Sequence, residues 1–600
     1  MANQLERHQV PRDETWDLES LFADAADWEA GVAEVRAALA GLARYEGQLA
    51  GDAQSLLACL QARDTVRIRL MHVLGYASHR RSVDGTDPEA QAMVSVARSL
   101  QAEASAALTF ITSEIVALPA ERLQSFLAAE PGLAVYEHFL ADVRDAAPHT
   151  LSPETELALA ALEGALDAPG AIHRAINTDM RYPAVLVAGE SVALTVARHE
   201  RLLASPDRDV RRRAHAALGE GLAAHKTAMA AALGAHVQKT VSVARLRRFA
   251  SARAMVLQPS RIPVPVYDAA LQTLLAGVAP HARRYVALRR RVLGLDRVWQ
   301  YDLAAPLDPG YTESLSFAHG ARSIQDGLAV LGIEYGSILQ RAFSERWIDR
   351  ADNAGKQHGA YSAGLYGWHP VILMTWQNRL RDMFVLAHEL GHTCHSYLSA
   401  KYQSFVNVRG PRMGMFFIES PSTCNELLLG QYLLAQPMDG RRRRQIIEAL
   451  LGTFWHNLVN HLLQAEVERR LYALAETGRP VTLQAICTAQ AETFAAFYGD
   501  SVHSDGTDEL IWETVPHYYQ TCYPLVYGVG LAGACAVATA VQSEGLPAVE
   551  RWLSALRAGS TLFPLELFAL AGVEMSRPEA VCAGVDYFGQ LVTELEASYA

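Results

Sequence analysis

Residues 384–392 carry side chains that can bind a metal ion and hydrolyse a bond. His388 and His392 lie four residues apart in a stretch whose apolar pattern predicts a helix, so both imidazoles project from one face. Two imidazoles on one helix provide half of a tetrahedral zinc site. Glu389 cannot reach the metal with them but can reach a water that the metal activates. This spacing predicts a zinc ion, an activated water and a carboxylate base, which is the chemistry of metal-assisted peptide hydrolysis.

Two histidines leave a third protein ligand to be found. Glu419 and Glu426 lie seven residues apart, nearly two helical turns, around a helix start predicted at Pro421, so both can face the zinc helix. One of them can bind zinc while the other holds the free N–H of a ligand imidazole, and the spacing leaves open which does which. His395 continues the ligand face, but three consecutive ligands on one helix crowd a tetrahedral ion. We therefore interpret His395 as a packing residue or as a partner of the ligands.

The composition describes a globular chain of two to four lobes. Six hundred residues exceed one ordinary core, and 50% hydrophobic against 20% charged residues exclude a disordered chain. The net charge of −12 argues against nucleic acid as the main partner. We interpret two basic clusters, residues 289–291 and 441–444, as solvated helix faces or helix starts. Seven scattered cysteines without a pairing rhythm indicate free thiols in a reducing compartment.

No segment of the sequence indicates a membrane partner. Residues 1–22 are rich in charge and lack the apolar region of a signal peptide. The longest uncharged apolar run, residues 525–541, has 17 residues and three glycines, which is marginal for a membrane span. We predict that it forms a buried core helix, and we expect the protein to be cytoplasmic.

The elements that must position this chemistry are mainly helical. Helical periodicity fills residues 14 to about 150 and returns from 200 to about 295. Between these stretches, residues 184–196 predict a hairpin. A second strand-like patch covers residues 359–376, just before the zinc helix, and almost all of the chain after 415 has a helical pattern. The sequence therefore predicts a mainly α fold with a small β element beside the site.

Several further motifs accompany the zinc helix along the chain. They occupy residues 207–211, 355–356 with 359–362, 386–392, 419–423 with 425–426, 516–519, 559–560, 563–566 and 571–575. Through these motifs, residues 110 to 595 resemble the oligoendopeptidase F branch of the thimet-oligopeptidase-like zinc peptidases. The resemblance implies a helical, neurolysin-like zincin fold, an ellipsoid with a deep central channel and zinc at its floor. It also implies cleavage of short unstructured oligopeptides, because folded proteins cannot enter the channel.

The resemblance also implies a role for each candidate site residue. Glu419 would be the third zinc ligand beside His388 and His392, with one zinc ion per chain. Glu426 would support a ligand imidazole from outside the coordination sphere, and Glu389 would be the general base.

His517 and the tyrosines after it would hydrogen-bond the substrate carbonyl and the oxyanion. Relatives usually carry a denser run of tyrosines there, and this chain keeps Tyr523 and Tyr527 but has glycine and valine at other positions of the run. We take Tyr527 as the first candidate for the oxyanion donor, with Tyr523 and Tyr519 as alternatives. Tyr519 is also a candidate for substrate binding.

The patch that contains Gly359, Ala360 and Tyr361 resembles an edge strand that pairs with the substrate backbone. Main-chain hydrogen bonds of this kind tolerate many side chains, which predicts broad specificity.

We predict an N-terminal helical domain over residues 1–200 and a zinc peptidase catalytic domain over residues 201–600. The leading interpretation is a zinc endopeptidase that acts on oligopeptides. One alternative is a zinc exopeptidase on the same scaffold, similar to a dipeptidyl carboxypeptidase, which would need a cationic group to fix the terminal carboxylate. Another is a non-catalytic helical peptide-binding protein with a vestigial metal site, although the intact Glu389 argues against it. The oligomeric state stays open.

Overall fold

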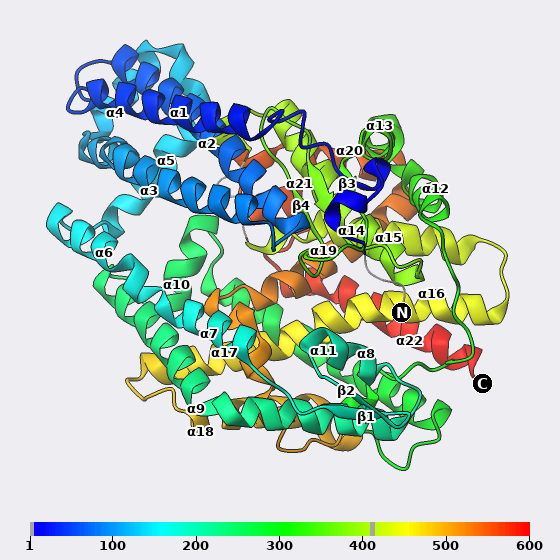
Figure 1. The fold of residues 1–600 in the computed structure, drawn as a ribbon. Coiled ribbons are helices and arrows are strands. Elements are labelled where there is room, and N and C mark those ends of the chain that lie inside the picture. The colour runs from blue at the N-terminus through cyan, green and yellow to red at the C-terminus, as the bar shows by residue number, and fades with distance from the viewer. Residues whose placement is uncertain (1–4, 409–414) are drawn as a thin grey trace.

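The N-terminal part of the chain is a group of antiparallel helices, which Figure 1 shows in blue and cyan. A computed structural model describes residues 5–408 and 415–600. The first helices are α1 (Ala25–Leu42), α2 (Ala53–Val83), α3 (Pro88–Ala117), α4 (Ala120–Ala129), α5 (Glu137–Ala146), α6 (Pro153–Leu166) and α7 (Ala168–Asp179). Aspartate caps start three of them, because the Asp24, Asp52 and Asp87 side chains accept hydrogen bonds from first-turn backbone N–H groups. At the start of α6, the Ser152 side chain accepts a hydrogen bond from the backbone N–H of Thr155.

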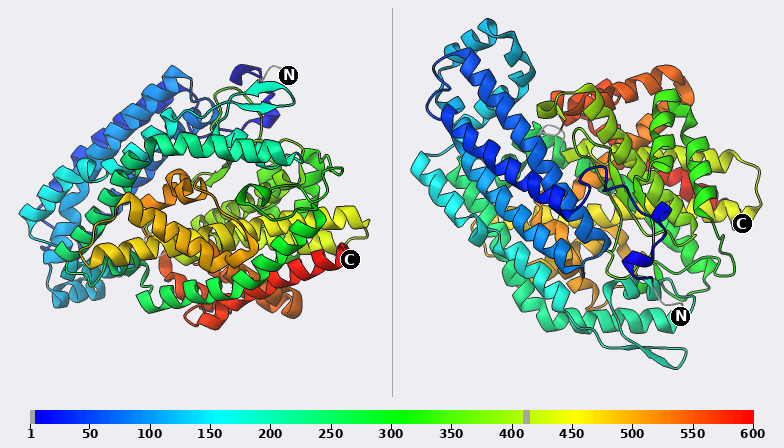
Figure 2. Two further views of the ribbon diagram at one scale, coloured as in Figure 1. Left: turned by 90° about the horizontal axis from the view of Figure 1, so that it is seen from below. Right: turned by 45° about the horizontal axis from the view of Figure 1, so that its top comes forward.

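The middle of the chain begins with the predicted hairpin. Strands β1 (Val185–Val187) and β2 (Glu190–Val192) pair antiparallel, and the hairpin ends at Val192, before the predicted end at residue 196. Four helices follow, namely α8 (Val196–Leu203), α9 (Arg208–Leu246), α10 (Ala252–Leu257) and α11 (Val264–Val292). Asp207 caps α9, because its side chain accepts hydrogen bonds from the backbone N–H groups of Asp209 and Val210. Helix α9 packs against α17 and α18, as the view from below shows (Figure 2).

The rest of the chain builds the main core around two central helices, α14 and α15. Its helices are α12 (Phe317–Leu328), α13 (Gly332–Ser344), α14 (Leu380–Tyr402), α15 (Ser420–Ala435), α16 (Gly440–Phe454), α17 (His461–Glu476), α18 (Leu483–Tyr498), α19 (Pro524–Glu544), α20 (Leu546–Arg557), α21 (Pro564–Leu570) and α22 (Cys582–Ser598). A π-helical turn (Trp455–Asn460) joins α16 to α17. Two 3-10 segments, η14 (Asp508–Thr514) and η15 (Pro516–Tyr519), precede α19.

A three-stranded sheet separates the N-terminal helices from the main core. Strand β5 (Val371–Leu373) lies between β3 (Ile348–Asp349), which is parallel to it, and β4 (Tyr361–Ala363), which is antiparallel. Val371 and Leu373 pack on α1–α3, whereas Ile372 packs into the main core. This alternation follows from the two-residue period of a strand. The predicted strand patch is confirmed, and β4 is an edge strand of this sheet.

The predicted core helix is α19. Among the described residues it is the one single helix that is long and apolar enough to cross a membrane, and 78% of its apolar window is buried inside the protein. A pair of helices, α10 with α11, passes the same test only if taken together across a 98° bend. Helix α19 packs against α15, α17 and α22. The absence of a membrane partner stays a prediction.

Arg289 corrects the interpretation of one basic cluster. We expected residues 289–291 to lie on a solvated helix face, but Arg289 is buried. Its guanidinium donates to the hydroxyl of Tyr285 and to the backbone carbonyls of Asp302 and Ala305. Buried carbonyl oxygens therefore take the place of water around this cation. The second cluster, residues 441–444, lies at the start of α16, as predicted.

The predicted boundary at residue 200 falls inside α8. Helix α7, before that boundary, packs against α9, after it. The division into two domains stays a prediction.

Candidate metal centre and active site

His388, His392 and Glu419 converge on one point. The Oε2 atom of Glu419 lies 3.5 Å from His388 Nε2 and 3.3 Å from His392 Nε2. The three ligand atoms all lie within 4.8 Å of one another. Two imidazole nitrogens and one carboxylate oxygen are a donor set of zinc sites that leave a fourth position for water or substrate. We call these three residues the metal cluster.

Gly391 explains how Glu419 reaches the two histidines. A Cβ atom at residue 391 would lie 2.3 Å from the carbonyl oxygen of Pro421 and 2.6 Å from Ser422 Cα. Only a glycine therefore lets the start of α15 lie directly against α14. Glu419 is the N-cap residue of α15, so this close approach brings its carboxylate to the imidazoles. On the other side, Gly530 of α19 leaves 3.0 Å between its hypothetical Cβ and Glu419 Cβ.

Glu426 fixes the tautomer of His388. His388 Nδ1 lies 2.8 Å from Glu426 Oε1, so Nδ1–H donates to the carboxylate and the Nε2 lone pair faces the metal cluster. The other oxygen of Glu426 accepts a 2.5 Å hydrogen bond from the Thr453 hydroxyl, and Arg381 lies 3.5 Å from it. Burial opposes the charged form, but the hydrogen bond from His388 and the nearby Arg381 lower the pKa of Glu426 overall. The geometry therefore places Glu419 among the candidate metal ligands and Glu426 outside them, against His388 Nδ1.

Glu389 lies beside the metal cluster and is buried, with 7% of its surface exposed. Burial raises its pKa above the usual value, although the neighbouring imidazoles His388 and His392 oppose this. A carboxylate with a raised pKa is a better proton acceptor at neutral pH than an exposed one.

His517, Tyr523 and Tyr527 form an aromatic wall that faces the metal cluster. The Tyr527 hydroxyl lies 3.5 Å from His517 Nε2, and the Tyr523 ring stacks on His517 at 5.7 Å. Burial raises the pKa of both tyrosines, and the Glu419 carboxylate raises them further. That interaction indicates that both hydroxyls lie within electrostatic reach of the metal cluster.

Tyr519 and His395 lie apart from this wall. The Tyr519 ring packs against His173 at 4.6 Å and against His236 at 5.2 Å, so the structure does not bring it together with Tyr527. His395 is buried and packs edge-on against Phe417, which agrees with the packing interpretation.

The three residues predicted to bind substrate lie at the start of strand β4. Tyr361 is its first residue, and Gly359 and Ala360 directly precede it. Gly359 has a φ of +94°, a conformation that favours glycine. The Tyr361 side chain points away from the main core, and its hydroxyl lies 3.1 Å from His79 Nδ1. The Tyr361 side chain therefore belongs to the contact between β4 and the N-terminal helices. The Ser362 hydroxyl lies 2.8 Å from that of Thr393, which ties the strand to α14 one residue after His392.

Two histidines that the sequence did not single out complete the site. His461 stacks on Tyr527 at 4.1 Å, and its Nε2 lies 3.2 Å from His456 Nε2. Gln464 Oε1 lies 2.8 Å from His461 Nδ1. Burial lowers the pKa of His456 to about 4 and that of His461 to about 3, so both are neutral at pH 7. His456 and His461 are five residues apart across a π-helical turn, and this spacing does not match the period of an α-helix. Only the unusual density of histidine in this segment could have indicated from the sequence that they belong to the site.

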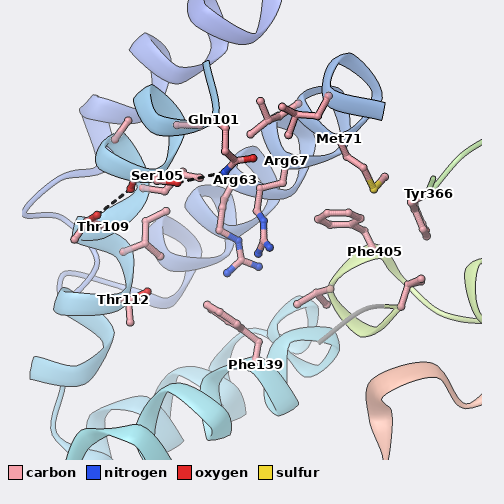
Figure 3. Close-up of a pocket in the computed structure, with 18 of the residues that line it drawn as sticks. Arg63, Arg67, Met71, Gln101, Ser105, Thr109, Thr112, Phe139, Tyr366 and Phe405 are labelled. Carbon is pink, nitrogen blue, oxygen red and sulfur yellow. Dashed lines mark hydrogen bonds between the residues drawn. The ribbon is translucent and has the colours of Figure 1, made fainter. Parts of the chain in front are cut away.

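A cavity of about 2470 Å³ is lined by α2, α3 and α5 and by the second half of α14. Figure 3 shows the side chains of Arg63, Arg67 and Phe139 in its wall. The cavity begins at Ala363, the last residue of β4, and passes Ser396 of α14. In its wall, Arg63 lies 4.0 Å from the ring centre of Phe139, and Arg67 lies 5.8 Å from that of Phe405. The residues of the metal cluster do not line this cavity. It therefore extends the space beside β4 away from the metal cluster.

The chain is similar to known peptidases over nearly its whole length. The family model described as peptidase family M3 matches residues 201–587, and the one described as oligopeptidase F matches residues 114–182. Oligopeptidase PepF of Bacillus subtilis is 32% identical over 99% of this chain and 89% of its own. Group B oligopeptidase PepB of Streptococcus agalactiae is 31% identical over 97% of this chain and 96% of its own. The crystal structure of oligoendopeptidase-F from Enterococcus faecium has a TM-score of 0.75 at 25% identity, covering 96% of this chain and all of that one.

Proposed function

Because this chain belongs to peptidase family M3, we propose that it is a zinc-dependent endopeptidase that cleaves internal bonds of short, unstructured oligopeptides. The observation that carries the proposal is the metal cluster, whose donor atoms have the separations and chemistry of a zinc site. A bound zinc ion would polarise the scissile carbonyl and lower the pKa of a water molecule. The relatives named oligopeptidase support the choice of oligopeptides as substrates.

Side chains of this protein would carry out the proton transfer, the stabilisation of the oxyanion and the orientation of a metal ligand. Glu389 accepts a proton from the attacking water while the water oxygen forms a bond to the carbonyl carbon. Glu389 then gives this proton to the amine nitrogen when the C–N bond breaks. His517 and Tyr527 donate hydrogen bonds to the carbonyl oxygen as negative charge develops there. Glu426 holds His388 in the tautomer whose Nε2 can bind the metal.

The unpaired edge of β4 would align the substrate. Backbone N–H and C=O groups on this edge can extend the sheet by one strand, which holds a peptide regardless of its side chains. The cavity that begins at Ala363 would receive one end of a longer peptide. This arrangement supports a preference for peptides over folded proteins, because a folded chain cannot present an extended strand inside a cavity.

The exopeptidase alternative needs a cation that fixes a terminal carboxylate near the scissile bond. Arg381 is the cation in direct contact with the residues that support the metal cluster, and it donates to Thr453 at 3.0 Å and lies beside Glu426. It is therefore already paired. The cations that line the cavity are Arg63, Arg67, Arg247, Arg341 and Lys401, and this lining does not include the metal cluster.

Peptides with blocked ends test the proposal directly. A fluorogenic peptide of about ten residues, acetylated and amidated, should be cut at an internal bond, since a cleft holds an extended peptide without needing its termini. A chelator should abolish cleavage, and added zinc should restore it. Release of dipeptides only, and only from peptides with a free carboxyl end, would establish the exopeptidase instead. Cleavage that survives complete metal removal would reject both.

A further inference from the structure

A second group of metal-binding side chains lies on α9, away from the metal cluster. His215 of α9 faces Asp508, the first residue of η14, and Asp505 in the loop before it. His215 Nε2 is 3.4 Å from Asp505 Oδ1 and 3.2 Å from Asp508 Oδ1. The three ligand atoms lie within 4.8 Å of one another. We call these residues the α9 cluster.

The separations in the α9 cluster match those of the metal cluster, where the corresponding distances are 3.3 and 3.5 Å. Donor atoms that share a tetrahedral ion at about 2.0–2.2 Å lie about 3.3 Å from one another. A charged hydrogen bond between imidazole and carboxylate would be shorter, at about 2.7–2.9 Å. The spacing therefore fits atoms around a common ion better than atoms bonded to each other.

Two of the three ligand atoms are buried and have no hydrogen-bond partner. His215 is 2% exposed and Asp508 is 4% exposed. His215 Nε2 and Asp508 Oδ1 lie within ion-pair distance of each other, but neither atom has a partner with the alignment of a hydrogen bond. Leaving a buried polar atom without a hydrogen bond costs stability. A ligand shared by these atoms would remove that cost for both.

The backbone aims the two carboxylates at His215. Asp508 Oδ2 accepts from the backbone N–H of Asp505 at 2.9 Å, and Asp505 Oδ1 accepts from the N–H of Thr507 at 2.8 Å. Each carboxylate is thus oriented by the loop itself. Asp508 Oδ1 keeps both its lone pairs, and Asp505 Oδ1 keeps one, for a ligand on the side of His215.

Gly219 lets this loop lie directly on α9. It follows His215 by one helical turn, and a Cβ atom there would lie 2.2 Å from Thr507 Oγ1 and 2.9 Å from Thr507 Cβ. The absence of a side chain at Gly219 therefore lets the loop that carries Asp505 and Asp508 pack closely on α9. Gly391 permits a similar close approach at the metal cluster.

We propose that His215, Asp505 and Asp508 form a second divalent-metal site, which binds Zn²⁺ through one imidazole and two carboxylates and completes its shell with water. The site is separate from the proposed catalytic zinc and does not depend on it. Its ion would hold the start of η14 against α9. Since η14 leads through Val515 into η15, which carries His517, the second ion would stabilise the segment that delivers His517 to the active site.

Metal counting on variants of the full chain tests this site. After zinc loading and dialysis against metal-free buffer, the wild-type protein should hold two zinc ions per chain. Asp508→Asn should hold one, because the amide keeps the size of the side chain but loses its charge. Glu509→Gln is the matched control, since it removes the adjacent exposed carboxylate, and it should hold two.

Two further variants separate the sites. His388→Ala combined with His392→Ala should also hold one zinc ion but should be inactive. Asp508→Asn should keep the catalytic zinc and retain measurable turnover, at a reduced rate because the segment that carries His517 is held less firmly. If Asp508→Asn does not fold, as circular dichroism would show, Asp505→Asn changes an exposed side chain of the same cluster and should again hold one ion. One zinc ion in the wild type that is lost entirely in the double histidine variant would overturn the second site and leave the catalytic one intact. Two ions in both Asp508→Asn and Asp505→Asn would overturn it as well.

Discussion

Replacing Gly391 with alanine should disable the metal cluster without touching any of its ligands. The new Cβ atom would lie 2.3 Å from Pro421 O and 2.6 Å from Ser422 Cα, where ordinary contacts begin at 3.4 Å. These atoms belong to the backbone and cannot rotate away, so α14 and α15 must separate by about 1 Å. Glu419 moves with the start of α15. Metal–ligand distances tolerate changes of only about 0.2 Å, so the cluster should lose its geometry.

The magnitude follows from two costs. Overpacking of this kind destabilises a fold by about 1–3 kcal/mol, and misplacing a ligand should weaken metal binding by at least the 10–100-fold typical of disturbed supporting residues. The assay is the free zinc concentration that gives half-maximal turnover of a blocked fluorogenic peptide. We expect this concentration to rise at least tenfold in Gly391→Ala.

Gly336→Ala is the matched control. Gly336 lies inside α13 with no atom within 4 Å of its hypothetical Cβ, so alanine there should keep wild-type zinc dependence and stabilise the protein by about 0.4–1 kcal/mol. If Gly391→Ala showed the zinc dependence and turnover of the wild type, close helix packing would not be what places Glu419, and our reasoning would be refuted.

Three further predictions concern the surroundings of the site. Tyr527→Phe should lower turnover by about 10²–10³ with unchanged zinc content, and a larger loss in Tyr523→Phe would transfer the donor role to Tyr523. Glu426→Gln should weaken zinc binding about 10–100-fold in a chelator competition, and an unchanged affinity would show that its charge is not needed. Burial lowers the pKa of His236 to about 4, below the ordinary 6.5, so the unfolded chain binds more protons between these pH values. The free energy of unfolding should therefore fall as pH drops from 6.5 to 4, by up to about 1.4 kcal/mol per pH unit for this residue. In a thermal-unfolding series over this pH range, His236→Phe should lose less stability than the wild type. An equal loss of stability in both proteins would contradict this role of His236.

Local signals in the sequence predicted the parts of the site that one element holds. The four-residue spacing of His388 and His392 defines a helix face by itself, and the apolar run of residues 525–541 predicted the buried α19. The motifs also identified the family, which the matches over nearly the whole chain confirm.

Contacts between distant segments were not predictable in the same way. Seven residues separate Glu419 from Glu426, and this placed both on one side of α15 without saying which is nearer the metal. The structure separates them because Glu419 is the N-cap, whereas Glu426 lies inside the helix and meets His388 Nδ1. Tyr519 shows that residues close in sequence can also point to different places. It is two residues after His517, but a 3-10 turn directs its ring toward α7 and α9.

Glu389→Gln tests the central claim most directly. The amide has nearly the size of the carboxylate but cannot accept a proton from water. Zinc content, measured by elemental analysis, and turnover of a blocked peptide should be determined on the same preparation. We predict unchanged zinc content with turnover reduced by about 10²–10⁴. Near-normal turnover, or the loss of one zinc ion per chain, would contradict the assignment of Glu389 as the general base beside the metal cluster.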